Sequence, residues 1–271
     1  MDEETKRRII NEVKKSGHPT SIKSSYILNK SGWFVKNSPR YFDREIKKYR
    51  ELDILAQKNS FLFQKSVDYL LIECKKNSSC PWIFFKQKRK NRSVYTLNIA
   101  ETTEGRIYDA LKKNKIFEKH PYYDKNFSTY YFVGYKNQGK EEGREIDVAI
   151  NQTTSALYFY INQLIDFAEN NNQKLVYPSF YYPLIVFEGD LFEVEIDGVD
   201  IEVNETNHVS LLVEQELKEP AIMGTLDINK KFPLFSKQII IDIVKLDYLE
   251  EYLKNLKLKN KEPINKDDPT N

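Results

Sequence analysis

The stretches YRELDILA (residues 49–56) and DYLLIECKK (residues 68–76) decide how this chain folds. Each is a short apolar run with an acid among its apolar residues, Asp53 in the first and Glu73 in the second. Such runs are typical of strands, and the second is apolar on both faces, as expected in the middle of a covered sheet. We therefore predict two neighbouring strands that each carry such an acid.

The two acids predict a cation site. Burying a carboxylate costs several kcal/mol unless a partner compensates its charge. Hard cations such as Mg²⁺ or Mn²⁺ take oxygen ligands, usually one or two carboxylates with water and substrate phosphate. Asp53, Glu73 and the main-chain carbonyl of Cys74 would supply these ligands. The alternative is a pair of strand-edge acids that face solvent or bond to neighbouring residues.

Lys75 adds a positive charge to this group. Side chains alternate along a strand, so Glu73 and Lys75 point to the same face, and Cys74 points to the other. The lysine is therefore expected beside the carboxylate, where it could orient an attacking water or stabilise the transition state. For Cys74 we predict a buried packing role and no part as a nucleophile.

Charge is distributed unevenly after the second stretch. No acid occurs from residue 74 to residue 100, whereas residues 187–205 hold eight acids and no Lys or Arg. A basic segment of this kind predicts contacts with nucleic-acid phosphates, and a solvated lysine-rich loop is the alternative. The candidate contacts are Lys76, Lys86, Lys88, Arg89, Lys90 and Arg92.

The rest of the chain predicts an α/β fold with a mixed sheet. Apolar periodicity and turn residues predict helices at 3–15, 20–31, 104–113, 146–170 and 248–258, and strands at 33–42, 49–57, 67–75, 128–135, 182–187, 191–196, 209–214 and 238–244, with turns at Gly189 and Gly198. We expect an N-terminal helix (1–19), a core (20–200) with an insertion at about 87–143, a C-terminal β-rich extension (201–258) and a disordered tail (259–271).

The two opening stretches resemble the motif of the PD-(D/E)xK nuclease superfamily, which has the restriction-endonuclease-like fold. The resemblance implies a core of helix, three strands, helix and strand, here residues 20–31, 33–75, 146–170 and 182–187. It also implies that Asp53 and Glu73 are metal ligands and that Lys75 is the catalytic lysine.

Two features depart from that motif. Leu52 stands where the family usually has proline, and residues 20–31 contain no acid, whereas many members carry a glutamate on this helix. Glu12, on the preceding helix, is a substitute candidate. Glu51 shares the strand face of Asp53, and Gln152, near the start of the long helix, is a further candidate for the site.

Composition narrows the class of protein. The chain has 271 residues, a net charge of +2, two cysteines and three widely spaced histidines, so nothing in the spacing predicts a zinc site. The first residues are acidic, and no apolar stretch reaches membrane-spanning length. We therefore expect a cytoplasmic protein with no membrane partner.

These observations favour a metal-dependent nuclease that acts on DNA as an endonuclease. One alternative is a catalytically degenerate module that binds nucleic acid without cleaving it. Another is a subunit of a defence or repair complex, or a homodimer, which the 18 tyrosines and 16 phenylalanines would permit.

Overall fold

The computed structural model describes residues 1–44, 46–60, 66–87, 98–100, 122, 126–134, 144–171, 179–214 and 238–256. The predicted helix at 104–113 and the predicted tail at 259–271 lie outside these residues. The described elements are α1 (Glu3–Lys15), α2 (His18–Lys30), β1 (Phe34–Asn37), β2 (Arg40–Asp43), β3 (Lys48–Glu51), β4 (Ile54–Asn59), β5 (Val67–Gln87), β6 (Asn98–Ala100), β7 (Phe127–Val133), α5 (Arg144–Asn170), β8 (Ser179–Asp197), β9 (Asp200–Glu205), β10 (His208–Glu214), β11 (Gln238–Lys245), η1 (Leu246–Tyr248) and α7 (Leu249–Asn255).

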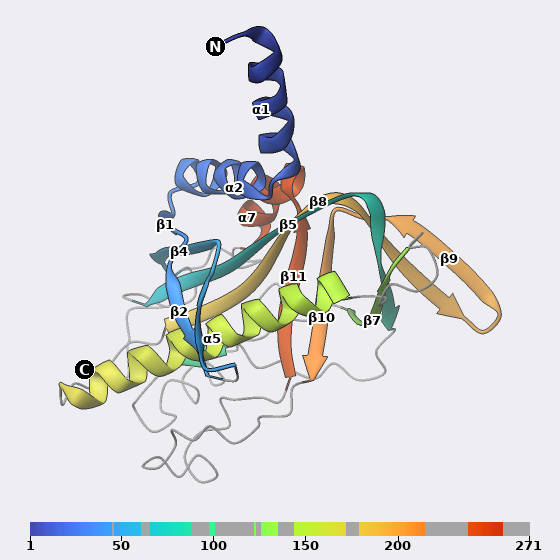
Figure 1. The fold of residues 1–271 in the computed structure, drawn as a ribbon. Helices are drawn as coiled ribbons and strands as arrows, with labels where there is room; N and C mark the ends of the chain where they lie inside the picture. The colour runs from blue at the N-terminus through green and yellow to red at the C-terminus, as the bar shows by residue number, and fades with distance from the viewer. Residues whose placement is uncertain are drawn as a thin grey trace.

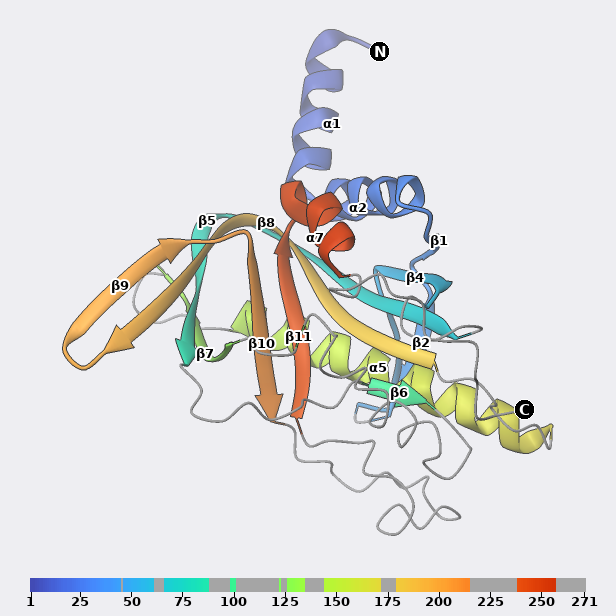
Figure 2. The same cartoon turned by 180° about the vertical axis from the view of Figure 1, so that it is seen from behind.

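Within the described part of the chain, nine strands form one mixed sheet, which confirms the predicted α/β class with parallel and antiparallel strands. Its order is β1-β4-β5-β7-β10-β11-β8-β6, with β5 also paired to β8, and β9 paired to β8. The long strands β5 and β8 run parallel side by side, and β9 extends the far end of β8 as a hairpin (Figure 2). Strand β7, within the range expected to be an insertion, pairs with β5.

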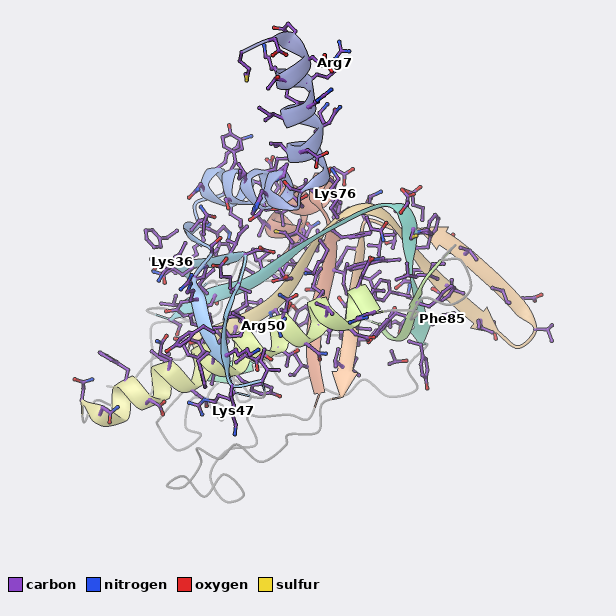
Figure 3. All side chains as sticks on the ribbon, viewed as in Figure 1. Arg7, Lys36, Lys47, Arg50, Lys76 and Phe85 are labelled. Atoms are coloured by element: carbon purple, nitrogen blue, oxygen red, sulfur yellow. The ribbon has the colours of Figure 1, made fainter. Side chains whose placement is uncertain are left out.

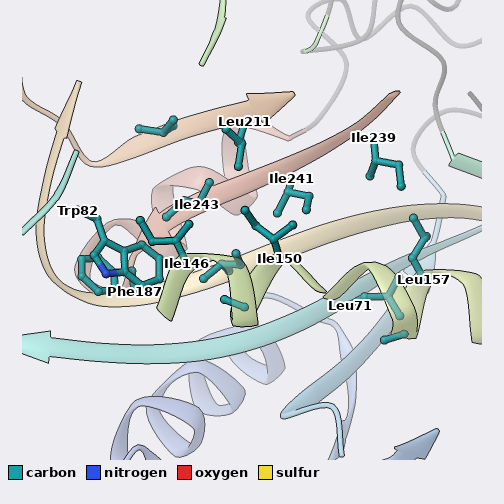
Figure 4. Close-up of a cluster of buried hydrophobic side chains, with 14 of the residues drawn as sticks. Leu71, Trp82, Ile146, Ile150, Leu157, Phe187, Leu211, Ile239, Ile241 and Ile243 are labelled. Carbon is teal, nitrogen blue, oxygen red and sulfur yellow. The ribbon is translucent and has the colours of Figure 1, made fainter. Parts of the chain in front are cut away.

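Helices cover both faces of this sheet (Figure 1). One buried cluster joins α5 to alternate residues of β5, β8, β10 and β11, including Leu71, Ile150 and Ile241 (Figure 4). The other cluster joins α2 and α7 to the intervening residues, such as Ile72. Full burial of an aliphatic side chain of this size stabilises the fold by about 2 kcal/mol. The two-sided apolar run around residue 71 therefore serves two separate cores.

The predicted hairpin of residues 33–42 and 49–57 is interrupted. Strands β1 and β4 pair within the main sheet, whereas β2 and β3 form a separate two-stranded sheet that packs on α5. The chain leaves the main sheet at Ser38, which has a φ of 46°, and Pro39, which has no amide hydrogen to donate. The Ser38 amide donates to the Asp53 carbonyl across this break, so Asp53 lies where the two sheets diverge.

Gly189 does not form the predicted turn, because strands 182–187 and 191–196 belong to one continuous strand, β8. A Cβ atom at Gly189 would lie 2.2 Å from the carbonyl oxygen of Asn77. The glycine therefore allows the backbones of β5 and β8 to approach closely. Gly198, with a φ of 67°, does form the predicted turn between β8 and β9.

Helix α2 begins at His18, two residues before the predicted start at residue 20. Pro19 occupies its first turn, where a missing amide hydrogen costs nothing and the fixed φ suits a helix. Among the described helices, none combines the length and apolar character needed to cross a membrane.

Candidate active site

Asp53 lies opposite Glu73 of β5, but it stands in a bend between β3 and β4 and not within a strand as predicted, because the chain passes there from one sheet to the other. The antiparallel register of β4 and β5 pairs Ile54 with Ile72, so the next position on each chain is Asp53 and Glu73. The Cys74 amide donates to Oδ2 of Asp53 at 2.7 Å and holds this carboxylate against β5. Burial raises the pKa of Asp53, an effect opposed by the Cys74 amide and by the charges of Lys75 and His18.

Glu73 is almost completely buried, with 4% of its surface exposed. Burial raises its pKa to about 7, and the negative charge of Asp53 acts in the same direction. The charges of Lys75 and Arg50 favour the ionised form and limit this rise. Two carboxylates thus share a poorly hydrated space in which at least one resists ionisation at neutral pH.

Lys75 links β5 to α5. Its Nζ donates to Oε1 of Glu73 at 2.6 Å and to Oε1 of Gln152 at 3.0 Å. Tyr41, on β2, is fully buried and donates its hydroxyl to the main-chain carbonyl of Gln152 at 3.1 Å. The structure therefore brings together Asp53, Glu73, Lys75 and Gln152, and it fixes α5 against the hairpin at this point.

The donor set fits a divalent cation that is coordinated mainly by oxygen. The half-buried carboxylate of Asp53 and the buried carboxylate of Glu73 face one lysine, Lys75. When both carboxylates are ionised, these three side chains carry a net negative charge. Within the described part of the chain, no three or more Asp, Glu, His or Cys side chains gather as a metal-holding group, so neither Glu12 nor Glu51 completes one. Mg²⁺ needs no such set, because water and substrate phosphate fill its remaining positions.

Glu51 and Glu12 both lie on exposed positions. Glu51, on β3, forms a weak ion pair with Arg40 at 3.7 Å, and its charge raises the pKa of Asp53. Glu12 lies on α1, which projects from the body of the protein (Figure 1).

The sequence did not predict three residues that act on this site, namely Tyr41, Arg50 and His18. Arg50 pairs with Asp43 at 3.2 Å and lies close enough to lower the pKa of Glu73. His18, at the start of α2, lowers the pKa of Asp53. Only Arg50 had a local signal, since it stands on the same predicted strand as Asp53, three residues before it.

Acidic side chains of β8 neutralise the positive charges of Lys76 and Lys86, the two candidates of the predicted basic segment that the structure describes. Lys76 pairs with Glu188 at 2.7 Å, and Lys86 pairs with Glu193 at 3.1 Å and Glu195 at 2.9 Å. The parallel pairing of β5 with β8 sets the basic run beside the acidic run, which explains why both occur. The other candidates, Lys88, Arg89, Lys90 and Arg92, lie outside the described residues.

Cys74 has the buried position expected for it. Its side chain is 7% exposed and lies in the core beneath α2, with the Ser24 hydroxyl 3.9 Å from Sγ. Burial raises the pKa of the thiol far above its usual range, so the nucleophilic thiolate is disfavoured.

The pKa of Glu73 predicts a pH-dependent stability. Below pH 4.5, the ordinary pKa of a glutamate, Glu73 is protonated in both the folded and the unfolded chain. Between pH 4.5 and about 7, Glu73 is protonated only in the folded chain. The free energy of unfolding therefore falls as the pH rises through this range. The loss is about 3 kcal/mol by pH 8. Urea unfolding in EDTA should show that the free energy of unfolding changes less with pH in Glu73→Gln than in the wild type, by about this amount. Parallel pH curves for the two proteins would contradict the assignment.

Comparison of the chain with models of known protein families, with curated proteins and with solved structures found no match in any of the three. The geometry of Asp53, Glu73, Lys75 and Gln152 is therefore the basis on which a function is proposed below.

Proposed function

We propose that this protein is a metal-dependent nuclease that hydrolyses phosphodiester bonds in DNA as an endonuclease. The observation that carries the proposal is that the half-buried Asp53, immediately before β4, lies opposite the buried Glu73 of β5, with Lys75 bonded to Glu73 at 2.6 Å. A carboxylate pair beside a lysine suits water attack on phosphorus, in which negative charge develops on oxygen.

The arrangement of strands supports the same proposal. In chain order, α2 precedes β1, β4 and β5, which pair in that order as antiparallel neighbours, and α5 then leads to β8, which is parallel to β5. This is the helix, three strands, helix and strand order implied by the resemblance to the PD-(D/E)xK superfamily. Asp53 immediately precedes the second of these strands, and Glu73 lies on the third.

Each residue has a separate role in this proposal. Asp53, Glu73 and the Cys74 carbonyl would hold Mg²⁺ or Mn²⁺, which when bound lowers the pKa of water and neutralises charge on phosphate. The Cys74 amide orients Asp53. Lys75 donates hydrogen bonds toward the attacking water and the developing phosphate charge, and Gln152 holds its ammonium group in place.

The test is cleavage of supercoiled plasmid and of labelled single strands with Mg²⁺, Mn²⁺ or EDTA. We expect nicked and linear products with either metal and none in EDTA, and no products from Asp53→Ala. Asp190→Ala, which removes an exposed aspartate of β8, is the matched control and should cleave like the wild type. Cleavage in EDTA, or by Asp53→Ala, would refute the metal mechanism.

A second candidate is a module that binds nucleic acid without turnover, alone or within a defence or repair complex. The observation that favours it is the sequence of α2, which contains no acid to add to Asp53 and Glu73. DNA binding with no cleavage under any metal condition would support this candidate.

A further inference from the structure

The turn between β2 and β3 and its two strands carry a net positive charge. Residues 40–50 include five basic residues and two acids. Of these, Arg50 is paired with Asp43 at 3.2 Å. Arg44, Lys47 and Lys48 are exposed, and no carboxylate of the described residues, which omit Glu45, forms an ion pair with them. This differs from Lys76 and Lys86, whose charges are compensated by acids of β8.

The hairpin is firmly anchored at its base and projects at its tip. Tyr41 anchors it through the Gln152 carbonyl and lies against Phe159, with 6.1 Å between the ring centroids. Lys47, at the turn, points away from the body of the protein (Figure 3). Lys48 stands five positions before Asp53, so at about 3.3 Å per residue it lies at most about 16 Å from Asp53.

Lys47 occupies an unusual backbone conformation for a lysine. Its φ is 53°, in the left-handed region where glycine has no steric penalty. A glycine here would make the turn less strained but would remove the charge. Stability and charge at this position are therefore separable by substitution, which gives the hairpin a sharp test.

We propose that the β2–β3 hairpin grips the nucleic-acid backbone, with Arg44, Lys47 and Lys48 binding phosphates of the strand whose scissile bond lies at Asp53 and Glu73. The inference rests on the proposed function, because it places the phosphates relative to that site. A two-stranded ribbon fits the major groove of B-DNA, and lysine or arginine contacts to phosphate position a protein on a duplex without reading its sequence. The partner is a polyanion with regularly spaced phosphates.

The experiment measures binding apart from cleavage. Anisotropy of a fluorescein-labelled 30-base-pair duplex is followed in EDTA at several KCl concentrations, with full-length chains that carry Lys75→Ala. Adding Lys47→Ala and Lys48→Ala should weaken binding at least about tenfold and reduce the slope of log affinity against log salt by about 2. The control, Arg7→Ala with Lys14→Ala, removes two exposed charges of α1 and should bind within about twofold of its parent.

Lys47→Gly keeps the proposal falsifiable without risk to folding. We expect it to melt at the same temperature as its parent or higher, and still to bind DNA more weakly. Equal binding by the hairpin variants, equal loss in the α1 control, or displacement of DNA by poly-glutamate at matched charge would each overturn the inference. If the wild type cleaves DNA but binding does not depend on the hairpin lysines, only the role of the hairpin is refuted. If binding depends on the hairpin lysines but the wild type cleaves no DNA, only the nuclease activity is refuted.

Discussion

Lys75→Ala is expected to slow metal-dependent DNA cleavage by about a thousandfold or more, a loss typical of removing one donor that stabilises the transition state. The ammonium group of Lys75 donates hydrogen bonds to Glu73 and to Gln152 of α5, and the second bond fixes its position. Its loss removes the hydrogen-bond donor for the attacking water and leaves Glu73 and Asp53 without their lysine. Single-turnover nicking of supercoiled plasmid in Mg²⁺ measures the rate.

The neighbouring Lys76 provides a matched control. It is as exposed as Lys75, with 25% of each side chain accessible, but it points to the other face of β5 and pairs with Glu188. Lys76→Ala should therefore cleave within a few-fold of wild type. Equal losses in the two variants would mean that the effect comes from general charge on this strand, and the role of Lys75 would be lost.

Asp242→Ala is expected to lower the free energy of unfolding by about 4 kcal/mol, the cost of leaving several buried donors without an acceptor. Asp242 is fully buried on β11 and accepts hydrogen bonds from Tyr122 at 2.7 Å, Tyr252 at 2.6 Å and Ser210. His208 lies 2.9 Å from its Oδ1. The melting temperature should fall by roughly 10 °C.

The control for this variant is Asp247→Ala, which removes an exposed aspartate from η1, five residues further along the chain. Its free energy of unfolding should change by no more than about 0.5 kcal/mol. Urea unfolding followed by circular dichroism measures both variants. A loss below about 1 kcal/mol for Asp242→Ala would show that the cluster is weak or that water replaces the carboxylate.

Asp242 also shows that the local sequence pattern does not distinguish an acid with a structural role from an acid of the candidate active site. It stands in the apolar strand QIIIDIV, and Asp53 and Glu73 stand in similar runs. In the fold, Asp242 contacts two tyrosines, a serine and a histidine on the face of the sheet covered by α7, and the tyrosines and the histidine line a cavity of about 40 Å³ beside it. Asp53 and Glu73 instead meet each other. Only the neighbours from distant segments distinguish the two kinds of buried acid.

Strand periodicity explains which parts of the site were predictable. Alternation at period two placed Glu73 and Lys75 on one face and Cys74 on the other, as the structure has them. The two opening stretches were predicted to be neighbouring strands, and their observed register sets Asp53 opposite Glu73. The hairpin break at Ser38 and the continuity of β8 through Gly189 escaped prediction because both depend on packing against other segments.

By itself, the sequence determined the strand that carries Glu73, the strand that begins directly after Asp53, the face that Glu73 shares with Lys75 and the mixed α/β class, since these follow from local alternation and apolar runs. Tertiary structure decided which charges remain available. Gln152 reaches Lys75 across 77 residues, and the register of β5 against β8 compensates Lys76 and Lys86 with acids more than 100 residues away. Such pairings arise from long-range register, which no local period encodes. Among the described residues, the same tertiary structure leaves Arg44, Lys47 and Lys48 of the β2–β3 turn exposed and without an ion pair.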